Sequence, residues 1–419
     1  MKRRIYKLSL LAIAMLTAGQ LRAQDTTMSR DEQGTMEMKS SDCNRDITVM
    51  NIDLGITKRD LKVAMADLHS SLKEGLSDLH NSLKVLGPQL KDIGNDISTN
   101  FDDNKSDQLV QDGDISEKVK NYSKTYPMDA NDHLSVENKF GKVTVNTWAK
   151  NEVKVDVEIK VYAGDDGTAQ KMLDAISISD SKDGDAVSFH TNFGSSNSMW
   201  GLFNNMNDRH KAEVNYTIYM PANNGLNIDN RYGSTEVPDF NGKVSIECAY
   251  GSFDGGAMMH PGNQIEVRYG SAHIDGLSSG DVNVNYGSLD LGSVDKFNGE
   301  IRYSSAHIGR IRNSANIDAH YAGSIKVDNL DKNFSNFSSS SNYSSIKIGL
   351  DNSTNADFDI TVRYGGFDYS DLPIEITEKT PSDDSKGWKP TKNYKGHIGK
   401  GSSDRTINIS ASYGGVKFE

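Results

Sequence analysis

Between residues 61 and 101, apolar side chains recur at intervals of three or four positions. This spacing is typical of the apolar stripe of an amphipathic helix. The mean interval is about 3.6 residues, close to an 11-residue repeat, which suits a nearly straight helix or a weakly right-handed coiled coil. We therefore predict an amphipathic, coiled-coil-like helical segment over residues 57–101. Packing on its own domain and formation of a homo-oligomer through the stripe both fit the pattern. The stripe comprises Leu61, Met65, Leu68, Leu72, Leu76, Leu79, Leu83, Leu86, Leu90, Ile93, Ile97 and Phe101.

After a polar linker over residues 102–121, apolar and polar residues begin to alternate, as they do in half-buried strands. The alternation predicts strands over 134–140, 142–148, 152–162, 186–193 and 213–220. A short helix is predicted over 168–178. Residues 122–225 therefore form a mixed, mostly β part of the chain.

Residues 226–419 contain a repeat, marked by tyrosines that are followed by two small residues. Successive tyrosines are 18, 19, 17, 17, 18, 22, 21 and 49 residues apart. Regular spacing of this size implies one structural coil per repeat. The repeat residues are Tyr232, Gly233, Tyr250, Gly251, Tyr269, Gly270, Tyr286, Gly287, Tyr303, Tyr321, Tyr343, Tyr364, Gly365, Tyr413 and Gly414.

The apolar positions within a repeat change parity at the tyrosine. Val282 and Val284 lie four and two residues before Tyr286, whereas Leu289 and Leu291 lie three and five residues after it. A continuous strand would keep its parity, so the chain must bend here. Two short strands and two corners per repeat predict a β-solenoid, a parallel β-helix-like stack. We expect Gly233, Gly270 and Gly287 at these corners to adopt backbone conformations that β-branched residues resist.

Stacking would also align charged residues in columns. Four positions after the tyrosines, allowing for one extra residue, lie Glu236, Asp254, His273, Asp290, His307, Lys326, Lys347 and Asp368. A solvated sheet face explains such a column. A metal or proton site at Asp254, His273, Asp290 and His307 is the alternative, although the two histidines are two strand spacings, roughly 10 Å, apart. We predict no metal.

The composition excludes several classes of function. The 419 residues include 46 basic and 58 acidic side chains, a net charge of -12, which argues against nucleic acid as a partner. Cys43 and Cys248 are too few for a disulfide framework or a zinc site. Cys248 lies in the buried register and is predicted to be a core residue.

Residues 1–23 have the pattern of a signal peptide, with a basic start, an apolar run and Ala23 at the expected cleavage point. A flexible lead is predicted over 24–56. No later stretch is long and apolar enough for a transmembrane helix, so the protein is not expected to span a membrane. We expect an exported protein in the periplasm or at the cell surface.

Two loops do not follow the repeat pattern and are candidates for ligand contact. The first, over 194–207, contains Trp200 and Phe203, and capping of an exposed end of the stack is the alternative. The second, a loop insertion over 377–405, combines aromatic and cationic side chains, which can bind acidic glycans. A solvated insertion is the alternative there. Its candidate residues are Trp388, Lys389, Lys392, Tyr394 and Lys395.

Motifs that would indicate an enzyme are not found in the sequence. The chain has no phosphate-binding Gly-rich loop of the Walker type, no Gly-x-Ser-x-Gly and no paired-histidine metal helix. Asp183-Gly184-Asp185 lacks the ligand spacing of a calcium loop and is predicted to be a turn. We predict no catalytic residues and no cofactor.

One stretch resembles a known family. Val136-Glu137-Asn138-Lys139-Phe140, followed by Gly141-Lys142-Val143, Trp148 and Asn151-Glu152-Val153, is similar to the start of the putative adhesin domain of Gram-negative envelope proteins. Met220-Pro221 and the Tyr-Gly-Ser repeats are similar to later parts of that domain. The resemblance covers about residues 130–419, and it implies a β-repeat fold and an envelope location.

The sequence thus predicts an exported, non-enzymatic envelope protein whose β-solenoid binds a glycan or a surface protein. Two alternatives are a β-helix carbohydrate-active enzyme of the polysaccharide lyase type and a periplasmic structural or stress-sensing component. Acidic and basic residues clustered in one groove would favour the enzyme. Flat faces with exposed aromatic residues would favour binding.

Overall fold

The computed structural model describes residues 26–30, 36–40, 115–194, 210–351, 353–369, 372, 374–382 and 387–419. The chain divides into two compact units, Met1–Ser82 and Leu83–Glu419. In the first unit, β1 (Thr26–Arg30) and β2 (Met36–Ser40) pair antiparallel, within the stretch predicted to be a flexible lead. Thr26–Arg30 contains a single apolar residue, Met28, so it shows no alternation from which a strand could be recognised. The helical segment predicted over 57–101 lies outside the described residues.

The second unit begins with antiparallel strands. β6 buries every second side chain over most of its length and pairs with β3 on one side and β9 on the other. β7 and β8 form a hairpin whose turn contains Gly184 at φ 54°, as predicted for this turn. The helix α4 is capped by Asp165 and is shorter than predicted, because β7 already begins at Ile176. The bounds are β3 (Ser116–Pro127), β4 (His133–Lys139), β5 (Val143–Trp148), β6 (Glu152–Ala163), α4 (Asp166–Asp174), β7 (Ile176–Asp183), β8 (Ala186–Phe193) and β9 (Lys211–Pro221).

β3 corrects one predicted boundary. The strand starts at Ser116, within the stretch 102–121 that was predicted to be a linker. Its side chains are exposed or half-buried throughout, so it shows no apolar alternation that the sequence could reveal. Its pairing with β6, from Ser116 opposite Ala163 to Pro127 opposite Glu152, defines it as a strand.

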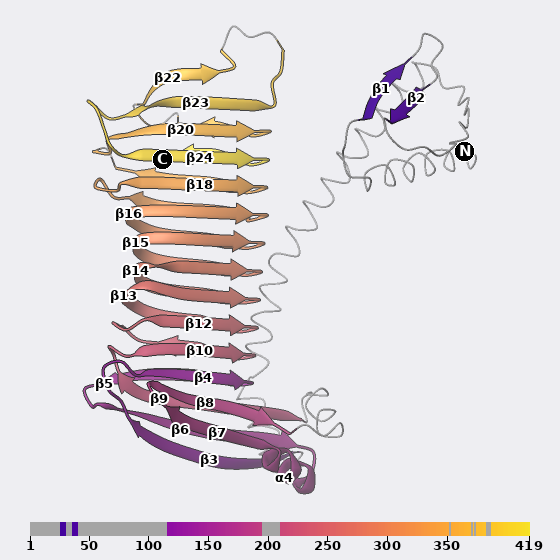
Figure 1. Cartoon of the computed structure of the whole chain (residues 1–419), viewed down its shortest axis with the longest axis vertical. Coiled ribbons are helices and arrows are strands. Elements are labelled where there is room, and N and C mark those ends of the chain that lie inside the picture. Colours follow the sequence, from indigo (N-terminus) through magenta and orange to yellow (C-terminus); the bar gives the residue numbers. More distant parts are fainter. Residues whose placement is uncertain are drawn as a thin grey trace. The chain divides into compact units, whose positions relative to one another are not determined.

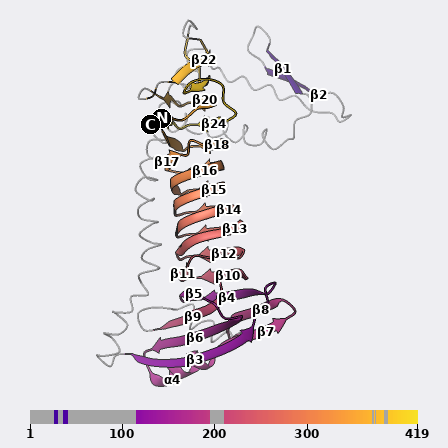
Figure 2. The same ribbon diagram turned by 90° about the vertical axis from the view of Figure 1, so that its left-hand side faces the viewer.

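Successive repeats pair in parallel and in register (Figure 1, Figure 2). Val267, Val284, Ile301 and Ala319, each two residues before a tyrosine, are direct neighbours across four strands. All 23 strands from β3 to β25, as far as the structure describes the chain, belong to one mostly parallel sheet. The bounds are β10 (Gly225–Arg231), β11 (Thr235–Val237), β12 (Val244–Ala249), β13 (Phe253–Arg268), β14 (Ser271–Asn285), β15 (Ser288–Arg302), β16 (Ser305–His320), β17 (Ser324–Leu330), β18 (Asn336–Asn342), β19 (Ser345–Leu350), β20 (Ala356–Arg363), β21 (Phe367–Asp368), β22 (Ile374–Thr380), β23 (Thr391–Ile398), β24 (Thr406–Ser412) and β25 (Val416–Phe418).

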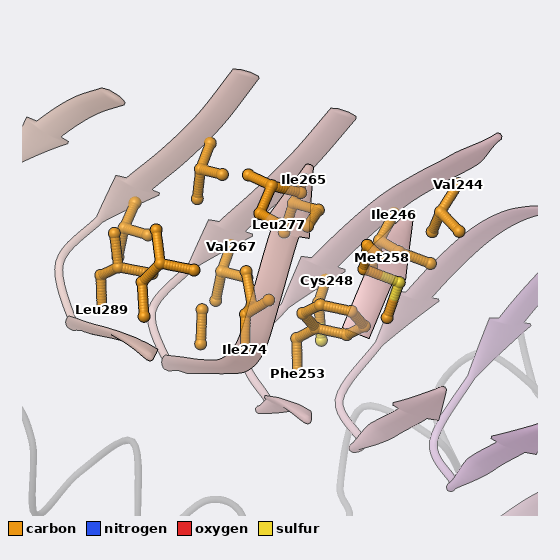
Figure 3. Packing of buried hydrophobic residues seen from close by; sticks show 14 of the residues in the cluster. Val244, Ile246, Cys248, Phe253, Met258, Ile265, Val267, Ile274, Leu277 and Leu289 are labelled. Atoms are coloured by element: carbon orange, nitrogen blue, oxygen red, sulfur yellow. The ribbon is translucent and has the colours of Figure 1, made fainter. Parts of the chain in front are cut away.

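One hydrophobic core runs through all the repeats. The apolar side chains on both sides of each tyrosine are buried, including Val284 before Tyr286 and Leu291 after it. Figure 3 shows this packing for the first repeats, where Cys248 lies among Phe253, Ile246 and Val267. Burial raises the pKa of the Cys248 thiol to about 12. The predicted core role of Cys248 is confirmed.

At one end of the stack the spatial order differs from the chain order. β24 lies between β18 and β20 (Figure 1). β25 lies between β19 and β21. Residues 406–418 therefore form an interior repeat, although they follow the 49-residue gap between tyrosines. In the charged column, Lys417 consequently lies between Lys347 and Asp368, which were predicted to be neighbours.

The insertion predicted over 377–405 is more regular than a loop. β23 pairs antiparallel with β20 and with β22, so the sheet ends in antiparallel strands here. Lysine, asparagine and glycine interrupt the alternation of β23, which hid this strand in the sequence. Within the described residues, no helix is long and apolar enough to cross a bilayer.

Candidate binding surface

The repeat tyrosines form a continuous stack of rings, which we call the tyrosine ladder. Neighbouring ring centroids are 4.6–5.1 Å apart, and the ring planes are inclined by at most 11°. The last seven rings keep 36–47% of their surface exposed, although most large aromatic side chains of the repeats are buried. The ladder in spatial order is Tyr232, Tyr250, Tyr269, Tyr286, Tyr303, Tyr321, Tyr343, Tyr413 and Tyr364.

The tyrosines themselves form the corners at which the parity changes. Each has a positive φ between 50° and 59°, a left-handed conformation that is rare for a bulky residue. The backbone N–H of each ladder tyrosine except Tyr364 donates to a neighbouring repeat, as from Tyr269 to the Asn285 carbonyl oxygen at 2.9 Å, and that of Tyr364 donates to the Pro390 carbonyl oxygen at 2.7 Å. The prediction that the following glycines adopt the unusual conformation is therefore wrong. Ring stacking and this backbone hydrogen bond hold the tyrosine in the left-handed conformation.

The glycines are required for a different reason, which is close approach. A Cβ atom on Gly287 would lie 1.7 Å from the Gly270 carbonyl oxygen, and one on Gly270 would lie 1.7 Å from that of Gly251. Gly233, Gly251, Gly365 and Gly414 have the same restriction, at 1.7–2.0 Å. Where the column contains Ser304 instead, its hydroxyl is buried and accepts a hydrogen bond from the Gly287 N–H at 3.0 Å.

Stacking covers the faces of the ladder rings and exposes their edges. At one end Phe140, also at positive φ, stacks on Tyr232 at 5.1 Å. The Phe193 ring contacts the Phe140 ring edge-on at 5.5 Å. Within the described part of the chain, none of the nine ladder hydroxyl groups has a hydrogen-bond partner. The ladder therefore offers a row of free phenol hydroxyls rather than open ring faces.

Trp388 extends the ladder at its other end. Its ring lies 5.7 Å from that of Tyr364, inclined by 41°, and 74% of the residue is exposed. The Arg363 guanidinium lies 5.5 Å from the centre of the Tyr364 ring. Trp388 is thus the aromatic side chain of this surface with the largest exposed area.

The other predicted loop residues have separate environments. Lys389 is exposed next to Trp388, and Lys392 is half-buried on β23. Lys395 forms ion pairs with Asp359 and Glu378 at 3.7 and 3.9 Å. Tyr394 is only 7% exposed and packs against Phe367, so it is a core residue and not a ligand contact. Trp200 and Phe203 lie outside the described residues.

A charge-compensated column runs beside the ladder. Arg231, Arg268 and Arg302 each precede a ladder tyrosine, and each forms an ion pair with the carboxylate two residues earlier. Glu266 accepts from Arg268 at 2.6 Å, which raises the pKa of that guanidinium further. The partners of the other two are Asp229 and Glu300. The charges of these three guanidinium groups are therefore matched within the protein, whereas Arg363 beside Tyr364 has no ion pair in the described part of the chain.

The histidine and aspartate column has direct hydrogen bonds. Asp290 lies between His273 and His307, at 3.2 and 2.9 Å from their Nδ1 atoms. Asp328 contacts His307 Nε2 at 2.7 Å, and this bond, followed by that to Asp290, raises the pKa of His307. In the described residues, His, Cys, Asp and Glu form no group suited to hold a metal ion.

An open groove of about 550 Å³ lies across five repeats. Its one carboxylate, Asp295, is paired with the Arg312 guanidinium, so it is not placed as a free base. The groove thus brings Asp295, Lys296 and Arg312 together, with the carboxylate compensated by the guanidinium. Its lining consists of Pro261, Ser278, Ser279, Asp295, Lys296, Arg312, Asn313 and Asn333.

The chain is similar to several solved structures at low identity. A putative cell adhesion protein from Clostridium sporogenes has 12% identity and a TM-score of 0.21, covering 72% of this chain and 99% of its own. A putative adhesin from Bacteroides fragilis has 12% identity and a TM-score of 0.25, covering 72% and 97%. A putative lipid binding protein from Parabacteroides distasonis has 10% identity and a TM-score of 0.32, covering 72% and 97%. No protein-family model and no curated protein matches the chain.

Proposed function

We propose that this protein is an exported, non-enzymatic component of the cell envelope whose repeats form a β-solenoid that binds glycans. The observation that carries the proposal is the tyrosine ladder, a continuous exposed aromatic edge that ends in the exposed Trp388. Exposed, contiguous aromatic surface in a protein is typical of interaction sites. The leader-like pattern of residues 1–23 supports export.

The β-solenoid interpretation rests on the pairing of the repeats. Parallel, in-register neighbours such as Val284 and Ile301 recur at every step, and both arms of each repeat bury apolar residues. Each coil thus covers the open core of its neighbour. The same architecture places every ladder tyrosine on one edge, which links the fold to the binding surface.

Trp388 and the tyrosine ladder are proposed to contact sugars in different ways. The exposed indole of Trp388 can stack on the apolar face of a pyranose ring, whereas the ladder offers hydroxyls. A surface protein is the other class of ligand that the sequence leaves open. Assembly through residues 57–101 and location in the periplasm or at the cell surface belong to the same proposal.

A glycan array probed with the chain lacking residues 1–23 tests glycan binding. We expect selective binding to a set of glycans, and weaker binding by Trp388→Ala at an unchanged melting temperature, because this side chain is mostly exposed. A matched control is Trp148→Ala, since Trp148 stacks on Tyr219 away from the ladder. Absence of any glycan binding by the unaltered chain would contradict the proposal.

Protease accessibility on intact cells tests the surface location.

A further inference from the structure

We propose that the tyrosine ladder is a track for an uncharged, linear polysaccharide that lies along the stack and forms hydrogen bonds with the phenol hydroxyls. This inference rests on the proposed function and names the ligand class and its site. It begins from the spacing of the rings. Nine phenols follow one another at 4.6–5.1 Å, which is the spacing of the strands that carry them.

The spacing discriminates between classes of linear ligand. An extended peptide advances about 3.3 Å per residue, so three of its residues span two steps of the ladder and it meets only every second tyrosine in the same register. One pyranose ring of an extended polysaccharide is close in length to one step of the ladder. A sugar chain can therefore present one hydroxyl-bearing ring to each tyrosine in turn.

The free hydroxyls supply the recognition chemistry. A phenol hydroxyl both donates and accepts hydrogen bonds, as sugar hydroxyls do. A second, shorter row lies two residues after Tyr269, Tyr286 and Tyr303, where Ser271, Ser288 and Ser305 are direct neighbours across the strands. Their hydroxyl groups also have no partner among the described residues. Two parallel rows of unoccupied hydroxyls match a polyhydroxylated ligand.

The stacked rings are ordered before any ligand binds. Each interior tyrosine is held between two neighbouring rings and by its left-handed backbone. Binding then costs little side-chain entropy, which a mobile surface would lose. An ordered, repeating row gains affinity from each further sugar that it contacts.

The charges beside the ladder favour an uncharged polymer. Arg231, Arg268 and Arg302 are paired with carboxylates of the protein, and the whole chain has a net charge of -12. A polyanion would have to displace those carboxylates and approach a protein of the same sign. A neutral polysaccharide meets neither obstacle.

The test compares chain lengths and removes hydroxyls. The binding of cello-, manno- and xylo-oligosaccharides of increasing length is measured by calorimetry, with heparin and polygalacturonate as polyanionic probes. We expect affinity for at least one neutral series to rise with length. The variant Tyr269→Phe/Tyr286→Phe/Tyr303→Phe should bind its long members at least about tenfold more weakly.

Phe140 indicates that phenylalanine fits a ladder corner. It has a φ of 62° and stacks on the ladder as a tyrosine does, so the melting temperature should be unchanged. Tyr219→Phe, outside the ladder, is the matched control and should bind as the unaltered chain does. If the triple variant unfolds, Tyr286→Phe alone replaces it.

The outcomes separate this inference from the proposed function. Glycan binding that is independent of length, is unaffected by the triple variant or is restricted to polyanions overturns the ladder track and leaves glycan binding intact. No binding to any glycan overturns both. Concentration-dependent self-association that the triple variant abolishes identifies a second copy of the chain as the occupant and overturns the inference.

Discussion

At the scale of single residues, the ladder corners combine an unfavourable backbone with favourable side-chain contacts. A left-handed conformation costs a non-glycine residue on the order of 1–3 kcal/mol. An aromatic pair contributes about 0.5–1.5 kcal/mol beyond its buried area, and each interior ladder ring belongs to two pairs. The two effects are of similar size, so tyrosine is tolerated where glycine would be expected.

Substitution of Tyr286 separates these two contributions. Tyr286→Val places a β-branched residue at a φ of 58° and removes two stacked pairs, so we expect a loss of about 2–5 kcal/mol of unfolding free energy. Tyr286→Phe should cost less than about 1 kcal/mol, since it keeps both stacked pairs. Urea denaturation compares the two. Equal losses for Val and Phe would show that stacking does not hold this corner.

The glycine column leads to a second prediction. Gly287→Ala places a Cβ against the Gly270 carbonyl oxygen, and we expect a loss of at least about 3 kcal/mol. Gly276→Ala is the matched control, because the nearest atom to its Cβ would be 3.7 Å away. The control should change stability by less than about 1 kcal/mol. Similar stabilities for the two variants, measured by chemical denaturation, would contradict the assigned close approach.

At the scale of elements, parallel strands align charged side chains that are far apart in the chain. His307 of β16 lies between Asp290 of β15 and Asp328 of β17, with Lys326 as its direct neighbour in the column. The carboxylates raise the pKa of His307, and Lys326 and His307 in turn lower the pKa of Asp328. A column of this kind makes the pairing of neighbouring strands dependent on pH.

His307 should stabilise the protein only at mildly acidic pH. Because its pKa in the folded state lies above the unfolded value of about 6.5, its contribution is fully present below that value. It is lost as the pH rises through the folded pKa. His307→Gln should therefore reduce stability more at about pH 5.5 than at about pH 8.5. An equal reduction at both values, in denaturation experiments, would exclude this linkage.

The sequence predicted those elements whose pattern is local. The burial of Val282, Val284, Leu289 and Leu291 follows from alternation and was read correctly. The left-handed conformation of the tyrosines could not be predicted from the sequence, because residue preference assigns positive φ to glycine. The ring stacking that outweighs this preference joins residues 17 or more positions apart. Tyr394 was assigned to the binding surface because the short strand β23 shows too little alternation to reveal its inward side.

At the scale of the whole molecule, the order of the repeats depends on contacts that no local pattern contains. The repeat of Tyr413 has the same motif as the others, so its sequence does not say which neighbours it takes. The structure inserts it between the repeats of Tyr343 and Tyr364. The ladder residues were thus identified from the sequence, whereas their spatial order was not.

This order predicts the effect of removing residues 406–419. β20 would lose its parallel neighbour β24, and the buried side chains of Ile407, Ile409 and Phe418 would leave the core. We expect hydrogen exchange to show loss of protection over 356–398 while β13–β16 stay protected. Replacement of residues 370–404 by a flexible Gly/Ser linker is the control, since it removes the outer strands and keeps β24. Retained protection over 356–398 after the first deletion would contradict the interior position of this repeat.

The interior position of β24 also bears on how the protein is made. Both during synthesis and during export, the N-terminal parts of a chain become available for folding before the C-terminal parts. β18 and β20 are synthesised before β24, yet in the native fold both pair with it and not with each other. Premature pairing of β18 with β20 would exclude the strand that belongs between them. We therefore expect the array to complete its folding by inserting β24 into its interior, and contacts of such long sequence separation form slowly.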